Sequence, residues 1–195
     1  MPFRVMAGHS SDVCAARFHP NDGYVLSASH DGTLRLWDVC SAACVRLLRG
    51  HTAAVRDVAV HPEGAYAASA SEDGTVLLWH LASGRAQSTL AAHDGPVTRV
   101  AFSSNGRLLA SASASRLALW DPKAILKEGA PPQPILTSES NEPLLTAAFV
   151  PQFPVLVALA QRHVQRGLVP DGIGLPGGVP SWQGNNGGDA KRPRP

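Results

Sequence analysis

One unit of about 42 residues occurs three times in succession in this 195-residue chain. Each copy opens with a histidine and closes with a tryptophan. The histidines are His9, His51 and His93, and the tryptophans are Trp37, Trp79 and Trp120. Successive histidines are 42 residues apart, and successive tryptophans are 42 and then 41 residues apart. Such a period is typical of proteins built from stacked units that complete their cores against one another, so we expect each copy to be one structural module.

Each copy contains four short apolar runs separated by turn residues. In the second copy these runs are Val55–Val60, Ala67–Ser71, Thr75–Trp79 and Arg85–Leu90. Asp73-Gly74 lies between the second and third runs, and this dipeptide between two apolar runs is a strong signal for a tight β-hairpin. The pattern therefore predicts four antiparallel strands per copy and an all-β chain.

The residues at the ends of the copies narrow the fold class further. The first copy opens with Gly8-His9 and closes with Trp37-Asp38. Repeated at this period, the frame resembles the WD-repeat β-propeller family. The resemblance implies one four-stranded blade per repeat. We place the repeats at about residues 8–49, 50–91 and 92–122, with a partial repeat at 143–160.

These repeats make up only part of a propeller. Residues 1–160 supply three blades and about half of a fourth, whereas known propellers have about four to eight blades. Phe3–Ala7 is expected to be the outermost strand of a preceding blade. Residues 161–195 are rich in Gly and Pro and lack a periodic pattern, which predicts a disordered tail. Because isolated blades expose sheet edges, we expect the chain to belong to a longer product, to pair with another chain or to be poorly stable alone.

Composition argues against several functions. The net charge is only +2, so we expect no direct binding to nucleic acid or membrane surfaces, and no apolar run is long enough to span a bilayer. The three cysteines are Cys14, Cys40 and Cys44. Their odd number and the lack of a second ligand pair nearby argue against a disulfide framework and a metal site. The sequence therefore predicts a reducing compartment, no metal, no cofactor and no small-molecule substrate.

Polar residues recur at fixed offsets in the copies. The sets are His9, Ser27, Asp31 and Trp37; His51, Ser69, Asp73 and Trp79; and the incomplete set His93, Ser111 and Trp120. A catalytic Ser-His-Asp triad is needed once, in a cleft, so a set in every blade favours a structural role, and we expect no catalytic residue. The resemblance implies a buried hydrogen-bond chain from Trp through Ser and His to Asp. In the third copy Ala114-Ser115 stands where Asp-Gly is expected, so we expect that blade to be held less tightly.

Two stretches are more particular than the generic repeat, namely Ala7–Val25 and Leu34–Arg46. Both resemble the propeller of the TBP-associated factor 5 family, the WD-repeat subunit of the general transcription factor TFIID, and its paralogue in SAGA-type coactivators. Three shorter stretches resemble later repeats of that propeller: Val76–Trp79, His93–Val97 and Leu117–Ile125. The resemblance implies a non-catalytic scaffold that binds other protein subunits in RNA polymerase II transcription initiation, in the nucleus.

The resemblance also implies contact positions along one rim of the propeller. These candidate contact positions are Ser11, Asp12, His30, Thr52, Glu72 and Asp94. His19 and His61 lie outside this set, and we interpret them as turn or surface histidines. Two other functions remain open. One is an unrelated WD-repeat adaptor for substrate recognition or signalling, in the nucleus or the cytoplasm, and the other is a truncated isoform without function.

Overall fold

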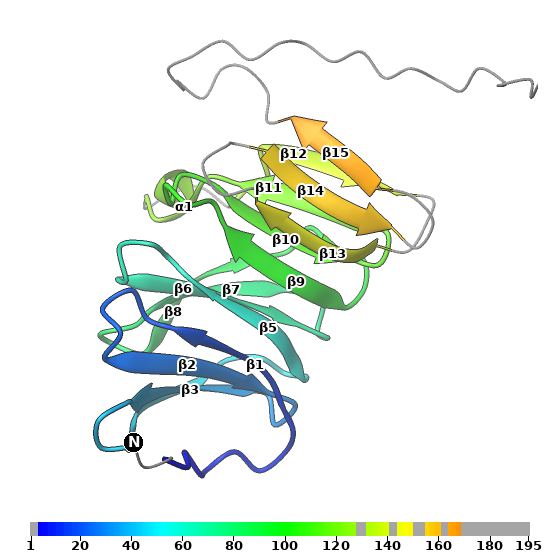
Figure 1. Ribbon diagram of the computed structural model, residues 1–195. Coiled ribbons are helices and arrows are strands. Elements are labelled where there is room, and N and C mark those ends of the chain that lie inside the picture. Colours follow the sequence, from blue (N-terminus) through cyan, green and yellow to red (C-terminus); the bar gives the residue numbers. More distant parts are fainter. Residues whose placement is uncertain (1–3, 128–131, 141–143, 150–154, 161–163, 169–195) are drawn as a thin grey trace, which may run out of the picture.

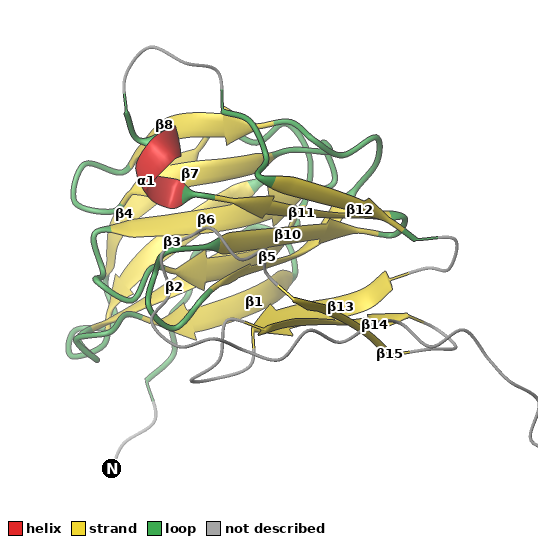
Figure 2. Ribbon diagram, turned by 90° about the horizontal axis from the view of Figure 1, so that it is seen from above, coloured by secondary structure: helices red, strands yellow, loops and turns green. Residues whose placement is uncertain are grey.

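The computed structural model describes residues 4–127, 132–140, 144–149, 155–160 and 164–168 (Figure 1). Within these ranges the chain forms three four-stranded sheets and one three-stranded sheet. Each sheet is a meander of consecutive antiparallel strands, and we call each one a blade. The blades follow one another in chain order, each facing the next, as Figures 1 and 2 show from two directions. The prediction of an all-β fold is confirmed.

The strand bounds follow the repeat. Blade one contains β1 (Val13–Phe18), β2 (Tyr24–Ser29), β3 (Thr33–Asp38) and β4 (Cys44–Arg49). Blade two contains β5 (Val55–Val60), β6 (Tyr66–Ser71), β7 (Val76–His80) and β8 (Arg85–Leu90). Blade three contains β9 (Val97–Phe102), β10 (Leu109–Ser113), β11 (Arg116–Trp120) and β12 (Leu136–Glu139). Blade four contains β13 (Leu144–Phe149), β14 (Val155–Ala160) and β15 (Val164–Leu168).

The connection from β11 to β12 includes the four-residue helix α1 (Pro122–Ile125). Asp121 caps this helix, because its Oδ1 accepts hydrogen bonds from the backbone N–H groups of Lys123 at 2.8 Å and Ala124 at 3.2 Å. Pro122 fits the first turn, where its missing N–H costs no hydrogen bond. No helix in the described part of the chain has the length and apolar character needed to cross a membrane.

The core lies between the blades. Between blades one and two it includes Leu26, Leu34, Leu48, Val55, Val58 and Trp79. Between blades two and three it includes Leu78, Leu90, Val97 and Trp120, and between blades three and four Leu108, Ala110, Leu144 and Ala147. A single sheet has no second layer against which to bury such side chains. Each large apolar side chain contributes about 1.5–3 kcal/mol when fully buried, so the blades stabilise one another.

The second strand of each complete blade ends in the small residues Ser-Ala-Ser. These are Ser27–Ser29 in β2, Ser69–Ser71 in β6 and Ser111–Ser113 in β10, and all of them are buried. Small side chains allow neighbouring sheets to approach closely without leaving voids. The alternation of hydroxyl and methyl groups also places one serine of each strand where it can take part in the polar network described below.

Turn histidines join successive blades at the edge where β1–β2 and β5–β6 connect. The Nε2–H of His19 donates to the carbonyl of Gly64 at 2.9 Å, and that of His61 donates to the carbonyl of Gly106 at 3.0 Å. Nδ1 of His61 accepts from the backbone N–H of Glu63 at 3.1 Å, which fixes the tautomer. His61 is only 7% exposed, so of the two interpretations of this residue the turn histidine is confirmed and the surface histidine is wrong.

Two strand predictions at the ends of the chain are wrong. Residues 4–7, expected to be a strand, have no regular structure, because no described sheet lies beside them to supply hydrogen bonds. In blade four, β15 pairs antiparallel with β14, in register Val155↔Leu168, where the sequence predicted irregular chain. The rest of the predicted tail, 161–163 and 169–195, lies outside the described residues. The outer strand of blade three, β12, pairs with β11.

We predict that Gly106→Ala lowers the free energy of unfolding by about 1–3 kcal/mol, because Gly106 has a φ of +69° and an added Cβ would meet the His61 ring. Gly95→Ala is the matched control, since an added Cβ at Gly95 has nothing within 4 Å. Urea unfolding of both variants measures the difference. Equal stabilities would show that the turn between β9 and β10 does not depend on this contact.

Candidate functional site

Buried polar side chains form the same hydrogen-bond chain in blades one and two. In blade one the Trp37 indole N–H donates to Ser27 Oγ at 2.8 Å, the Ser27 hydroxyl donates to His9 Nε2 at 2.7 Å, and His9 Nδ1–H donates to Asp31 Oδ2 at 2.9 Å. The corresponding distances for Trp79, Ser69, His51 and Asp73 in blade two are 2.8, 2.7 and 2.8 Å. Every donor along the chain has an acceptor, which offsets the cost of burying these groups.

The aspartate carboxylate at the end of each hydrogen-bond chain holds two loops together. In blade two, Asp73 Oδ2 also accepts from the backbone N–H of Thr52 at 3.1 Å, in the loop that leads into β5. Its Oδ1 accepts from the N–H and hydroxyl of Thr75 at 2.9 and 2.6 Å, in the β6–β7 hairpin. Asp31 makes the equivalent bonds to Ser10 and Thr33. The leading loop and the hairpin of each blade therefore form one rigid unit.

These hydrogen bonds control the ionisation of the groups. Burial alone would raise the pKa of Asp73, but the bonds from Thr75, His51 and Thr52 outweigh it and lower the pKa to about 2. The pKa of Asp31 is lowered in the same way. Burial lowers the pKa of His51, although its bond to Asp73 opposes the shift. Near neutral pH the hydrogen-bond chain of blade two therefore contains the Asp73 carboxylate and the neutral imidazole of His51.

Blade three has only the Trp-Ser-His part of this hydrogen-bond chain and lacks the aspartate. Trp120 donates to Ser111 Oγ at 2.9 Å, and Ser111 lies 2.7 Å from His93 Nε2. His93 Nδ1 is buried and has no hydrogen-bond partner among the residues that the structure describes. Burial, together with the nearby charge of Arg116, lowers the pKa of His93 to about 4. The missing hairpin aspartate thus leaves a buried polar nitrogen unsatisfied, which costs about 1–3 kcal/mol.

Arg116 follows the shortened hairpin of blade three and binds residues of the leading loop and of the outer strand. Its Nη1 donates to the carbonyl of Ala92 at 3.0 Å, in the loop that leads into β9. Its Nη2 lies 2.8 Å from Asp94 Oδ2 and 2.9 Å from Glu139 Oε1, on β12. One guanidinium thus links the leading loop to the outer strand, and it replaces part of the tie that a carboxylate makes in the other blades.

The leading loops and hairpins of blades one to three lie at one edge of the blades, which we call the rim. Five of the six candidate contact positions are exposed residues of this rim: Ser11, Asp12, His30, Thr52 and Asp94. The sixth, Glu72, is half-buried and forms an ion pair with Arg56. Backbone bonds from His30 to Asp12 and from Glu72 to Ala54, both 2.9 Å, hold the hairpins against the leading loops. The rim is therefore an ordered surface.

A second polar cluster, on the face formed by the innermost strands, was not found from sequence. Asp57 on β5 is 2% exposed. Its carboxylate accepts from Arg17 Nη2 at 3.1 Å and from the N–H groups of Val58 at 3.0 Å and Val100 at 3.2 Å. Burial raises the pKa of Asp57, and these donors oppose the shift. The available signal was a single acidic residue within the apolar run Val55–Val60.

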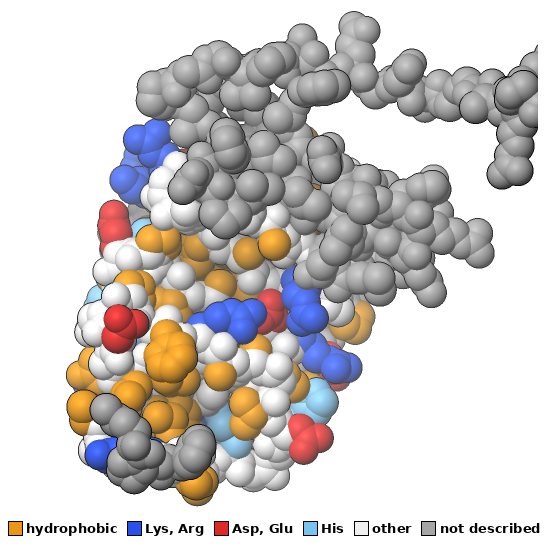
Figure 3. Space-filling view, in the orientation of Figure 1, with side chains coloured by type: hydrophobic (Ala, Val, Ile, Leu, Met, Phe, Trp, Pro, Cys, Tyr) orange, Lys and Arg blue, Asp and Glu red, His pale blue; other side chains and the backbone are white. Residues whose placement is uncertain are grey.

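Asp57 therefore joins three blades, since Arg17 belongs to β1 and Val100 to β9. Apolar and cationic side chains lie side by side on the face that presents β1, β5 and β9 (Figure 3).

Across the described residues, no group of three or more His, Cys, Asp or Glu side chains could hold a metal ion. Cys14, Cys40 and Cys44 are exposed free thiols.

Four-stranded meanders packed face to face, each complete one with a buried Trp-Ser-His chain, define an arc of a β-propeller. The family model described as WD domain, G-beta repeat, matches residues 1–38, 42–80 and 84–121, which is more than half of the chain. The chain belongs to the WD40 repeat family. The WD40 fold is typically a non-catalytic scaffold for protein interaction.

Similarity to curated proteins is confined to short segments. Nuclear distribution protein nudF of Emericella nidulans is 47% identical over 45 residues, which cover 23% of this chain and 10% of nudF. Human Pre-mRNA-processing factor 19 is 43% identical over 42 residues, covering 22% of this chain and 8% of that protein. Transcription initiation factor TFIID subunit 5 of Caenorhabditis elegans is 41% identical over 46 residues, covering 24% and 7%. The chain thus matches a tenth or less of the length of each relative.

Two solved structures share the fold over most of the chain. The structure of U3-55K superposes with a TM-score of 0.77 at 21% sequence identity, covering 86% of this chain and 52% of that one. The crystal structure of the RRP9 WD40 repeats superposes with a TM-score of 0.73 at 21% identity, covering 80% and 47%. The chain therefore spans about half the length of these two propeller proteins.

We expect Asp73→Ala to lower the free energy of unfolding by about 1–3 kcal/mol, because it leaves buried donors of His51 and the hairpin without an acceptor. Asp94→Ala is the control, since the Asp94 side chain is 81% exposed and its ion pair with Arg116 is worth about 1 kcal/mol or less. Thermal or urea unfolding measures both. Equal losses would count against the hydrogen-bond chain as a stabilising device.

The pKa of His93 predicts acid sensitivity. The folded chain resists protonation of His93 down to about pH 4, whereas the unfolded chain takes up the proton near pH 6.5. The unfolded state therefore binds more protons in this window, and stability falls as the pH is lowered from 6.5 toward 4. Replacing Ala114-Ser115 with Glu-Asp-Gly should supply an acceptor for Nδ1, raise the pKa of His93 and reduce this loss. Urea unfolding midpoints of the original chain and of the Glu-Asp-Gly variant, measured between pH 6.5 and pH 4, test this prediction. The same pH dependence of the midpoint in both proteins would refute it.

Proposed function

We propose that this chain is a non-catalytic protein-interaction scaffold of a TFIID- or SAGA-type complex in RNA polymerase II transcription initiation, and that it acts in the nucleus. The observation that carries the scaffold role is the rim. Its exposed positions lie on loops whose backbones are fixed by buried carboxylates, as with Thr52 and Asp73. A surface that is ordered before binding loses less conformational entropy when a partner docks.

The choice of complex rests on similarity. TFIID subunit 5 of Caenorhabditis elegans matches this chain over 46 residues. The resemblance of Ala7–Val25 and Leu34–Arg46 to the same family supports the same assignment. The partners are other protein subunits of the complex. The scattered charge of the rim, with Asp12, Glu72 and Asp94 among its residues, favours protein partners over nucleic acid.

A second candidate is an adaptor outside transcription initiation. Its support is the 47% identity to nuclear distribution protein nudF over 45 residues and the 43% identity to Pre-mRNA-processing factor 19 over 42 residues. The two candidates share the rim as binding surface and differ in the partners that dock there, and the adaptor is compatible with the cytoplasm. Identification of partners therefore separates the two candidates.

The test is affinity purification of the tagged chain from nuclear and cytoplasmic extracts, with partners quantified by mass spectrometry. We expect TFIID or SAGA-type subunits from the nuclear extract. The triple variant Asp12→Ala, His30→Ala and Thr52→Ala should lose most of them, since these exposed side chains contribute contacts without supporting the fold.

The matched control is the triple variant Arg85→Ala, Gln87→Ala and Thr89→Ala, at exposed positions of the outer strand β8. It should keep the partners. Recovery of a different set of subunits would favour the adaptor, and recovery of chaperones alone would contradict a scaffold role. Equal losses in the two triple variants would show that the rim is not the binding surface.

A further inference from the structure

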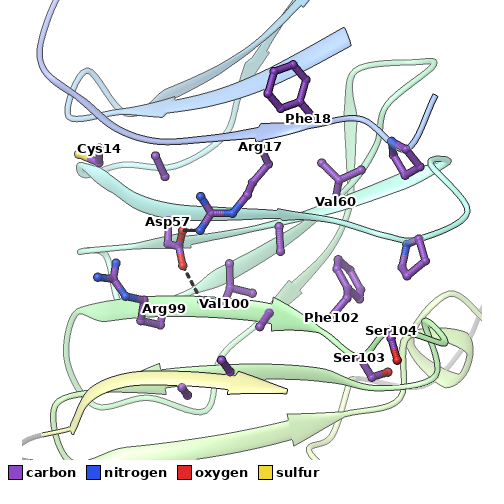
Figure 4. A pocket seen from close by; sticks show the side chains of 17 residues that line it. Cys14, Arg17, Phe18, Asp57, Val60, Arg99, Val100, Phe102, Ser103 and Ser104 are labelled. Atoms are coloured by element: carbon purple, nitrogen blue, oxygen red, sulfur yellow. Dashed lines mark hydrogen bonds and ion pairs between the residues drawn. The ribbon is translucent and has the colours of Figure 1, made fainter. Parts of the chain in front are cut away.

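A groove of about 630 Å³ runs across the innermost strands of all four blades (Figure 4). Its walls come from β1, β5, β9 and β13 and from the turns that follow the first three of these strands. Each innermost strand is the edge strand of its sheet. Edge strands carry backbone N–H and C=O groups without partners in their own sheet, so the groove can form hydrogen bonds with a peptide backbone.

One end of the groove is cationic. Arg17 and Arg99 both line it, with Asp57 between them (Figure 4). Arg17 is already engaged, because it is paired with Asp57 at 3.1 Å and donates to the carbonyl of Ala16 at 3.0 Å. Arg99 is exposed, and its Nη1 makes one bond of 3.3 Å to the carbonyl of Thr98. No carboxylate of the described residues forms an ion pair with Arg99, so its guanidinium can take an added anion.

The other end of the groove is aromatic. Phe18 is 68% exposed, and Phe102 lines the opposite wall, with Val60 on the strand between them (Figure 4). An exposed phenylalanine beside further apolar groups is a typical anchor point for a partner side chain. Arg99 and Phe102 are three residues apart on β9, which corresponds to about 10 Å along an extended strand.

We propose that this groove binds an extended segment of a protein partner in which acidic residues alternate with apolar residues. The acidic side chain pairs with Arg99, and the apolar side chain packs between Phe18 and Phe102. This inference builds on the proposed scaffold function and names the chemistry of one partner segment. It uses the innermost strands, a surface separate from the rim.

The charge of the groove favours such a peptide over a nucleic acid. A single strand places a phosphate at every nucleotide and needs a row of cations along its path. The groove offers two guanidinium groups and one carboxylate, so the excess positive charge is a single group. That charge matches one carboxylate, and charge-assisted hydrogen bonds of this kind are among the strong ones.

The test is fluorescence anisotropy of the full chain with a fluorescein-labelled peptide in which the unit Asp-Leu-Asp-Phe occurs twice. We expect saturable binding that weakens as salt is added. Arg99→Glu should raise Kd by at least about tenfold, since an attraction becomes a repulsion. Phe18→Ala should raise Kd by about three- to tenfold through lost apolar contact. Both side chains are exposed, so neither change removes a core contact.

The matched control is Arg85→Glu, an equal change of charge at an exposed position on the outer strand β8, which should leave Kd within about twofold. A peptide with Asn in place of Asp should bind at least about tenfold more weakly. Unchanged binding by Arg99→Glu, or equal binding of the Asn peptide, overturns the proposal. Displacement of the peptide by single-stranded oligothymidylate at equal concentration also overturns it, in favour of a nucleic-acid groove.

The outcomes of this test and of the partner purification are distinguishable. Peptide binding with the expected variant pattern supports the groove even if no transcription subunit is recovered, in which case only the assignment to a TFIID- or SAGA-type complex fails. Recovery of those subunits together with absent peptide binding overturns the groove and leaves the scaffold function intact.

Discussion

Burial of one blade against the next is the constraint on which this structure depends. The same repeat position shows its strength, because Val55 and Val97 are fully buried against the preceding blade, whereas Val13, with no described sheet in front of it, is 54% exposed. All three side chains are valine, and only the neighbouring blade differs. Stability in such a stack is approximately the sum of the intrinsic stabilities of the units and the interface terms between adjacent units. Features that join blades, such as His61 and Asp57, contribute to the interface terms.

Much of the fold could be predicted from the repeat, and the errors have physical causes. The His and Trp positions mark the blades, and Asp73-Gly74 marks a hairpin, because local turn chemistry and strand alternation are visible in sequence. Val164–Leu168 has no such frame and lies within a Gly- and Pro-rich segment. Its pairing with β14 is a contact between segments, which local composition does not encode. Residues 4–7 show the opposite case. They have the sequence pattern of a strand but form none, because no described sheet lies beside them.

Of the two candidate sites, the rim could be predicted from the sequence and the groove could not. The rim and its supporting network follow from residues that recur at fixed offsets, so sequence indicates which positions share one edge. The charges of the groove do not recur, because the strand position that holds Asp57 in β5 holds Arg99 in β9 and Ala15 in β1. Arg17 stands two residues further along β1. Arg17 and Asp57 are 40 residues apart and each is ordinary in its local run. Only the packing of β1, β5 and β9 brings them together.

The shortened hairpin of blade three has a consequence for recognition. A surface made of equal repeats offers a partner several equivalent ways to dock, each shifted by one blade, and nothing in identical units selects among them. Ala114-Ser115 removes that degeneracy, since among blades one to three only blade three lacks the hairpin carboxylate and has Arg116 linking Asp94 to Glu139. For a partner that docks on the rim, as we propose, the irregular blade three makes one alignment of partner and blades different from the alignments shifted by one blade. The missing hairpin carboxylate, which costs stability, can thereby contribute to specificity.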